Sequence, residues 1–266
     1  MWINKIYFNI VYLVFFKGPL GFLKNIFIKS PFFVPKIDLN EKCLSSKNSK
    51  IYFTHISRLY FYTLGINYRL KNLLNEYSIS RSILSLKKSD IVIDCGANIG
   101  EFSLAIYNEF KCKNIYAFEP DENEYKALNK NLNFGNCKPL KLGLSNKTGD
   151  FDFYLNNETG DSSLIYSRTN EKTKIKTITL DDFVKKFNIK SIALLKIEAE
   201  GFEPEIILGA IPVLNKIKYI TIDCSPERNG NTTFSEINDI LVKNNFTLLN
   251  FNSLRMSLLF QNKLIN

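Results

Sequence analysis

Two acidic residues and two glycines stand at a spacing that suits a bound nucleoside. The run Asp94-Cys95-Gly96-Ala97-Asn98-Ile99-Gly100 follows the apolar residues 91–93, and Glu119 comes nineteen residues after Gly100. Gly96 and Gly100 allow the backbone to turn sharply and to approach a ligand closely. A carboxylate at Glu119 can accept two hydrogen bonds from the hydroxyls of a ribose. The pattern predicts a cofactor pocket formed by Asp94, Cys95, Gly96, Ala97, Asn98, Gly100 and Glu119.

The spacing of the glycines separates two classes of nucleotide. A dinucleotide site needs G-x-G-x-x-G, so that a helix N-terminus can hold a pyrophosphate, whereas this loop has G-x-x-x-G with Asp94 before it. An acid at that position repels a pyrophosphate but suits the ammonium and sulfonium groups of S-adenosylmethionine. We therefore expect S-adenosylmethionine as the cofactor. Two alternatives stay open: a tight strand-to-helix turn that binds nothing, and an NAD-linked enzyme.

A second pair of carboxylates follows the apolar stretch 192–197. Methyl transfer requires the acceptor oxygen to be aligned with the methyl group, and a general base helps a hydroxyl to lose its proton. Glu198 and Glu200 are the candidates for this catalytic role, and Asp223 is a third choice. The structural alternatives are that Glu198 pairs with Lys196 and that Glu200 holds its own loop together.

Other polar residues carry weaker indications. Ser162 and Ser163 lie in the polar segment 156–174, a predicted loop that either closes over the cofactor, with Ser162 in contact, or forms turns. His55 is the only histidine, and we expect it to be structural or exposed because it precedes the predicted catalytic sheet. Carboxylates can bind Mg²⁺, but no spacing here demands a metal, so we predict none.

The elements that position these residues alternate between strands and helices from residue 91 onward. Repeated β-α units imply a mostly parallel sheet with helices on both faces, and such sheets bind ligands at the carboxyl ends of their strands. Two closing strands after the last helix predict an antiparallel hairpin at one edge. We therefore expect an α/β fold, a doubly wound, Rossmann-like, seven-stranded methyltransferase sheet with an N-terminal helical extension. The predicted strands are 91–93, 114–118, 139–142, 192–197, 219–222, 246–251 and 257–261, with an inserted, half-exposed strand at 151–155.

Helix starts are indicated by capping residues. Asp121 with Glu124, and Thr233 with Glu236, have the spacing of a capping box, in which each side chain bonds a backbone N–H group of the other residue. Thr179 begins a short helix in the same way, and Pro204 suits the first turn of another.

The chain divides by composition into two parts. Residues 1–50 form a predicted basic, apolar helical extension that ends in a polar linker or loop over 35–50, and residues 51–266 form the methyltransferase domain. Within that domain, 51–88 is a helical lead-in and 89–266 is the catalytic sheet. Residues 1–90 hold 14 Lys and Arg against 4 Asp and Glu, whereas the rest of the chain is near neutral.

The N-terminal residues 1–34 contain two short apolar stretches with interspersed lysines. Each is shorter than the roughly 20 residues that a membrane-spanning helix needs. We expect these helices to pack on the main domain or to lie peripherally on the inner face of a membrane, where the basic charge favours anionic head groups. The alternative is a general compositional bias toward Ile, Lys, Asn, Phe and Tyr.

The remaining composition bounds the class and the location. Hydrophobic residues make up 45% of the 266 residues and charged residues 23%, which is typical of a globular protein. No two cysteines have C-x-x-C spacing and their number, five, is odd, which argues against a disulfide scaffold and a zinc ribbon. We expect a cytoplasmic protein with no nucleic acid partner, and nothing in the sequence specifies an oligomeric state.

Five motifs, at 92–103, 117–120, 160–164, 179–183 and 195–203, follow one another along the chain. Together and in this order they resemble the motifs of the FkbM family of methyltransferases. The resemblance covers about residues 58–250 and implies O-methylation with S-adenosylmethionine, often on sugar hydroxyls of glycans, glycolipids or natural products. At Glu198 the chain departs from the family, which more often has Asp in the motif Lys-Ile-Asp. A non-catalytic nucleotide-binding or scaffolding protein on the same fold is the alternative function.

Overall fold

The computed structural model describes residues 35–47, 49–155, 162–165 and 171–265. The predictions for residues 1–34, including their helices and their membrane contact, lie outside the described residues. Among the described residues, no helix is both long enough and apolar enough to span a membrane.

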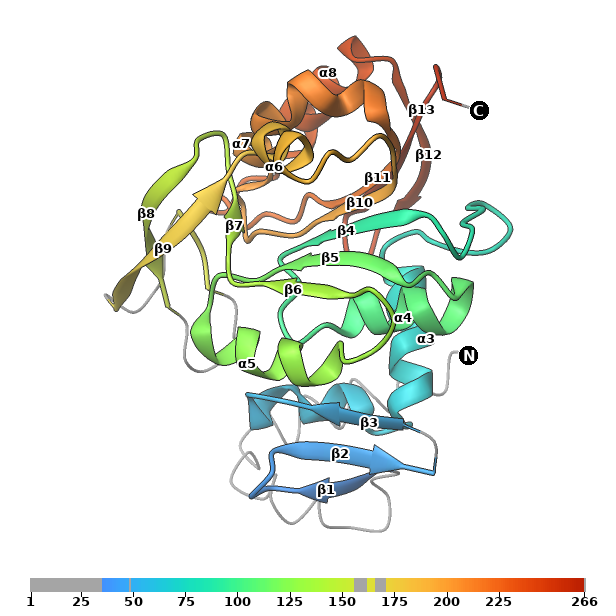
Figure 1. Ribbon diagram of the computed structural model, residues 1–266, viewed down its shortest axis with the longest axis vertical. Coiled ribbons are helices and arrows are strands. Elements are labelled where there is room, and N and C mark those ends of the chain that lie inside the picture. Colours follow the sequence, from blue (N-terminus) through green and yellow to red (C-terminus); the bar gives the residue numbers. More distant parts are fainter. Residues whose placement is uncertain (1–34, 48, 156–161, 166–170, 266) are drawn as a thin grey trace.

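A mixed seven-stranded sheet forms the centre of the described part of the chain (Figure 1). Its strand order is β12-β13-β11-β10-β4-β5-β6. Neighbours from β11 to β6 are parallel, while β13 runs antiparallel to both β11 and β12. The predicted sheet and its edge hairpin are therefore confirmed. The bounds are β4 Ile91–Cys95, β5 Asn114–Phe118, β6 Lys138–Leu140, β10 Ile192–Ile197, β11 Ile217–Asp223, β12 Phe246–Asn252 and β13 Ser257–Asn262.

Helices cover both faces of this sheet, as the repeated β-α units predict (Figure 1). Successive side chains of a strand point to opposite faces, so Val92 and Leu194 pack in one core and Ile93 and Leu195 in the other. The first core contains residues of α3 and α4, and the second contains residues of α6, α7 and α8. The helices are α3 Ile66–Glu76, α4 Glu101–Phe110, α5 Glu122–Asn131, α6 Leu180–Lys186, α7 Glu203–Ala210 and α8 Phe234–Lys243, with 3₁₀ helices η3 Ile56–Tyr62 and η4 Ile211–Lys216.

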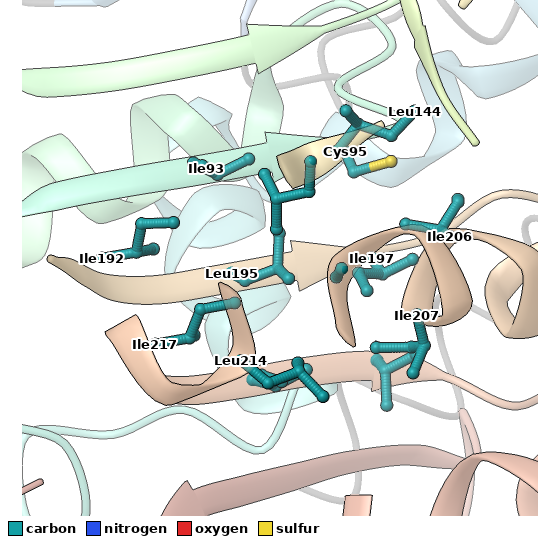
Figure 2. Packing of buried hydrophobic residues seen from close by; sticks show 14 of the residues in the cluster. Ile93, Cys95, Leu144, Ile192, Leu195, Ile197, Ile206, Ile207, Leu214 and Ile217 are labelled. Atoms are coloured by element: carbon teal, nitrogen blue, oxygen red, sulfur yellow. The ribbon is translucent and has the colours of Figure 1, made fainter. Parts of the chain in front are cut away.

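Packing in the second core fixes the position of α7 on strand β10. Figure 2 shows Ile197 of β10 beside Ile206 and Ile207 of α7, with Leu195 further along the strand in the same core. All four side chains are buried. Because α7 begins directly after the candidate carboxylates, this packing determines where the turn between β10 and α7 lies.

The predicted linker over residues 35–50 is wrong, because these residues form a three-stranded antiparallel sheet. Leu44 and Ile51 are fully buried in the core that contains α3 and α4. Asn131 of α5 joins the sheet to the main domain, since its side chain bonds both the N–H and the C=O of Tyr52. The strands are too short and too polar to show an alternating pattern. Their bounds are β1 Lys36–Asp38, β2 Cys43–Ser46 and β3 Ser49–Tyr52.

A second small sheet contains the predicted strand at 151–155, which is confirmed. Its strand order is β7-β9-β8, with β7 Gly143–Leu144, β8 Gly149–Tyr154 and β9 Lys172–Ile178. The sequence prediction missed β9, which begins inside the predicted loop 156–174. The signal was present, because exposed Lys174 and Lys176 alternate with buried Ile175 and Thr177 in the period-2 pattern of a strand.

The predicted caps are only partly correct. Asp121 caps α5, because its side chain accepts from the backbone N–H of Glu124, and Thr179 caps α6 in the same way. The Glu124 carboxylate does not complete its capping box, because it bonds Thr54 and His55 instead. The predicted box at Thr233 is wrong, since Thr233 makes no side-chain cap to α8.

Substituting a residue of the second core tests this packing. Leu195→Ala is expected to lower the free energy of unfolding by about 2–5 kcal/mol, because it leaves a cavity in a fully buried position. Denaturant unfolding measures this cost. Leu254→Ala is the control, because that side chain is 79% exposed and its loss should be nearly neutral. A cost for Leu195→Ala no larger than that of the control would contradict the described core.

Candidate active site

A cleft opens at the carboxyl ends of β4, β5 and β10, the place where the sequence predicts a ligand. Eight of the ten predicted site residues line it: Cys95, Gly96, Ala97, Asn98, Glu119 and Ser162 for the cofactor and Glu198 and Glu200 for catalysis. Ser162 enters it from the segment beside β8. Gly100 and Asp94 are not among the lining residues.

The first glycine of the loop is required by a close backbone contact. Gly96 has φ +71°, and a Cβ atom there would lie 1.8 Å from the carbonyl oxygen of Glu198. The N–H groups of Gly96 and Ala97 both donate to the carbonyl of Phe118, at the end of β5. The loop therefore lies between the ends of β5 and β10 and leaves no room for a side chain at residue 96.

Gly100 lies on the side of the loop that packs against α5 and not on the side that faces the cleft. It has φ +92° and immediately precedes α4. A Cβ atom at this position would lie 2.9 Å from Cδ1 of Leu128 in α5. The prediction that Gly100 permits a sharp turn is confirmed by this geometry, while its contact with a cofactor stays a prediction.

Asp94 differs from the expectation that it faces a ligand. Its side chain is fully buried and accepts a hydrogen bond of 2.7 Å from Ser103 of α4. The Nζ atom of Lys196 lies 3.2 Å from Asp94 Oδ1, in ion-pair range without hydrogen-bond alignment. The register of the sheet places these two residues side by side on β4 and β10. The charge on Asp94 therefore faces a lysine under the loop, because its side chain points into the face covered by α4.

Lys196 also lines the cleft, and sequence reasoning did not select it as part of the cofactor site. It is 1% exposed and donates to the carbonyls of Cys95 at 3.1 Å and Gly96 at 2.7 Å. Burial lowers the pKa of Lys196, but the carboxylates of Asp94 and Glu198 raise it above the usual value. The ammonium group therefore stays charged and holds the glycine loop in place.

Glu119 lies at the other end of the loop, as the sequence predicts. Its two carboxylate oxygens accept the backbone N–H groups of Asn98 at 2.8 Å and Asp121 at 2.9 Å. Burial raises the pKa of Glu119 to about 8. The charges of Glu124 and Asp121 also raise this pKa, whereas the two N–H donors lower it. The carboxyl group is fixed in orientation, and each oxygen keeps a lone pair for a further donor from the cleft.

Glu198 is held by cations and by a phenol. Its carboxylate pairs with Arg255 and with Lys196, and it accepts a hydrogen bond from Tyr77. Burial favours the protonated acid, but Arg255 and Lys196 hold the pKa of Glu198 well below its usual range. The structural alternative from the sequence, in which Glu198 pairs with Lys196, is therefore confirmed. A carboxylate with a depressed pKa accepts a proton poorly. The catalytic role of Glu198 therefore stays a prediction, and its ion pairs with Arg255 and Lys196 argue against that role.

Arg255 enters the site from the turn between β12 and β13, far along the chain from the glycine loop. Its guanidinium group lies 3.0 Å from the hydroxyl of Tyr77 and packs over that ring. It also lies 3.1 Å from Asp223 and 3.4 Å from Glu76. Asp223, the third predicted base, is 2% exposed and faces this guanidinium. No spacing or periodicity in the sequence indicates Arg255.

The N-terminal lead-in forms the opposite wall of the cleft. Arg58 and Phe61 of η3 and Arg69 of α3 line it. Arg69 is buried and bonds Glu101, at the start of α4, at 2.9 Å, while the hydroxyl of Tyr62 donates to the same carboxylate at 2.7 Å. These bonds fix the lead-in to the helix that follows the glycine loop. His55 is not a lining residue of this cleft and pairs with Glu124 at 2.6 Å, in agreement with its predicted structural role.

No group of three or more His, Cys, Asp and Glu side chains is placed to hold a metal ion in the part of the chain that the structure describes.

The charge network around Arg255 predicts a coupled effect on stability. Arg255→Met is expected to lower the free energy of unfolding at pH 7 by roughly 3 kcal/mol, because Glu198 and Asp223 lose the cation that compensates them. In a Glu198→Gln background the cost should be smaller, since one of these carboxylates is already neutral. Denaturant unfolding of the four proteins measures the coupling.

Lys185→Met is the matched control, because Lys185 makes an exposed ion pair with Asp181 on α6. Equal costs of Arg255→Met with and without the Glu198 carboxylate would show that the two residues are not coupled.

Comparison with known proteins places this site in a family. The sequence profile described as the methyltransferase FkbM domain matches residues 94–248, which is more than half of the chain. The hexuronic acid methyltransferase AglP of Haloferax volcanii is 26% identical over 159 residues, which cover 59% of this chain and 65% of AglP. The 2-O-methyltransferase NoeI of Sinorhizobium fredii is 23% identical over 189 residues, which cover 63% of this chain and 78% of NoeI.

A solved structure is also similar. The methyltransferase FkbM from Methylobacillus flagellatus matches 77% of this chain and 54% of that chain, with 18% identity and a TM-score of 0.49. The match thus spans less than two thirds of AglP and about half of the Methylobacillus protein.

Proposed function

The chain belongs to the methyltransferase FkbM family, and we propose from this that it transfers the methyl group of S-adenosylmethionine to a sugar hydroxyl of a glycan, glycolipid or natural product. The observation that carries the proposal is the cleft itself, which joins a glycine loop held by Lys196, a fixed carboxyl group at Glu119 and two further carboxylates. The similarity to AglP, a hexuronic acid methyltransferase, and to NoeI, a 2-O-methyltransferase, supports a sugar acceptor.

The residues of the cleft fit this cofactor. Glu119 offers fixed lone pairs to the two hydroxyls of a ribose, and Asn98 and Ala97 present the loop beside it. When bound, S-adenosylmethionine supplies an electrophilic methyl group on a sulfonium centre. Gly96 and Cys95 line the cleft between Glu119 and Glu198, so we assign the methionine part of the cofactor to this stretch.

We assign the proton-accepting role to Glu200 rather than to Glu198. Both line the cleft after β10, but the cations at Arg255 and Lys196 stabilise Glu198 in its charged form. Glu200 lines the cleft two residues further on and is half-buried. Its role is to take the proton of the acceptor hydroxyl as the oxygen attacks the methyl carbon.

The test is incubation with isotopically labelled S-adenosylmethionine and fractionated glycans and glycolipids, with the label followed into product. Glu200→Gln should lower kcat by about 100-fold or more, because a general base contributes at least that factor, and should leave the affinity for S-adenosylmethionine unchanged in calorimetry. Glu236→Gln, an exposed position on α8, is the control and should keep the wild-type rate. Cofactor binding without transfer to any fraction would favour the non-catalytic alternative, and no binding would overturn the proposal.

The raised pKa of Glu119 predicts a pH-dependent affinity. The free carboxyl group has a pKa of about 8, and the ribose hydroxyls favour its charged form because they donate to it. Binding should therefore tighten as the pH rises toward 8 and level off above it, approaching tenfold per pH unit on the acid side. Calorimetry with adenosine, which has no group that titrates in this range, measures the effect.

Glu119→Gln is the control for this prediction, because the amide keeps the shape of the side chain and does not titrate. It should bind more weakly, with an affinity that is independent of pH. The same pH profile in both proteins would show that Glu119 is not the titrating group.

Location and partners are proposals from the sequence. We place the chain in the cytoplasm, with residues 1–34 as a peripheral contact at the inner membrane face, on the basis of their basic and apolar composition.

A further inference from the structure

The turn that presents Glu200 to the cleft has a conformation that L-amino acids avoid. Glu200 has φ +52° and Gly201 has φ +93°, so two successive residues are left-handed. A glycine adopts this region freely, but a glutamate does so only where its surroundings hold it there. The contacts of residues 199–201 therefore show what holds Glu200.

The side chain of Glu203 holds the turn from the inside. Its Oε1 atom accepts the backbone N–H of Ala199 at 2.7 Å and that of Gly201 at 3.2 Å. The residue is 1% exposed, and its Oε2 atom is buried without a hydrogen-bond partner among the described residues. Burial raises the pKa of Glu203 to about 7. A buried carboxyl group with one unsatisfied oxygen weakens the fold, which argues for a role other than stability.

Ser163 holds the same turn from the other side. Its hydroxyl donates to the carbonyl of Glu200 at 3.1 Å, and the residue is buried. The backbone of Ser163 pairs with Tyr154 of β8 in both directions, at 2.8 and 3.0 Å. Ser162, its neighbour, lines the cleft. The segment at the mouth of the cleft is thus bonded directly to the peptide group of the proposed base.

Residues 227–228 contact the turn at residues 199–201 on a third side. The Nη1 atom of Arg228 lies 3.3 Å from the carbonyl of Gly201. A Cβ atom on Gly201 would lie 3.1 Å from the backbone nitrogen of Arg228 and 3.2 Å from the carbonyl carbon of Glu227. The turn therefore packs against the backbone of residues 227–228 and has no room to relax in that direction.

We propose that Glu203 and Ser163 are positioning residues, which hold the turn at 199–201 in its left-handed form so that the Glu200 carboxylate faces the acceptor hydroxyl. This proposal rests on the proposed function, because it gives Glu200 a proton to accept. It differs from a purely structural account, in which Glu203 only satisfies the N–H groups of Ala199 and Gly201 in the turn before α7. In that account the loss of either side chain affects stability and not the step that Glu200 performs.

The experiment is a double-mutant cycle on the full-length chain with labelled S-adenosylmethionine. Ser163→Ala should lower kcat by about 10-fold, and Glu203→Ala by up to about 100-fold, because a displacement of the order of 1 Å has costs of this size. The dissociation constant of S-adenosylmethionine should change less than about twofold. In a Glu200→Gln background, Ser163→Ala should change kcat by less than about twofold, since there is no longer a base to position.

Conservative variants separate position from folding. Glu203→Gln keeps an oxygen that can accept both N–H groups, and it should recover kcat to within about threefold of the wild type. Ser163→Thr keeps the hydroxyl and should do the same. If Glu203→Ala fails to fold, the Ser163 cycle carries the test alone, because that residue lies outside the secondary structure of the main sheet.

The outcomes distinguish the two proposals. A wild-type protein that transfers no methyl group overturns the proposed function and, with it, this inference. An active wild type in which Ser163→Ala costs the same factor with and without Glu200 overturns the positioning role only. Losses that appear in the affinity for S-adenosylmethionine rather than in kcat overturn it as well.

Discussion

The ammonium group of Lys196 lies between two carboxylates and two carbonyls, and the arrangement of the cleft depends on it. It faces Asp94 and Glu198 at 3.2 Å each and bonds the carbonyls of Cys95 and Gly96. These contacts join the ends of β4 and β10 and fix the first residues of the glycine loop. A neutral residue here would leave Asp94 fully buried with a single hydroxyl donor, which is far more costly than the pair.

The same charges extend across the cleft and connect parts of the chain that are distant in sequence. Glu198 forms an ion pair with Arg255 on the edge hairpin, and Arg255 also pairs with Glu76 at the end of α3. Glu76 bonds Arg69, which bonds Glu101 at the start of α4. Ion pairs of this kind contribute little net stability, because desolvation offsets their attraction. Their consequence is geometric, since they connect the lead-in and the hairpin to the strands of the cleft.

The sequence predicts the local elements of the fold, but it does not predict the direction in which individual side chains point. The strands, the hairpin, the glycine loop and Glu119 follow from short apolar runs and spacings, and the structure has them. Asp94 is at the predicted place along β4 but faces the buried side, because spacing does not say which way a side chain at a strand end points. Lys196 is hidden within an apolar run, and Arg255 lies in a turn without periodicity. The strands at 36–52 escape prediction because tertiary packing, and not pattern, stabilises them.

Glu198 and Glu200 illustrate how position divides two chemically identical groups. The first ends an extended strand, so its side chain falls between the cations at Lys196 and Arg255 and stays charged. Two residues later the chain is left-handed, and the hydroxyl of Ser163 donates to the backbone carbonyl of Glu200. Glutamate at 198, where the resembling family more often has aspartate, has the reach to meet Tyr77 and both cations together. The longer side chain at this position therefore suits an anchor of the cleft, which supports our proposal that Glu200 takes the proton.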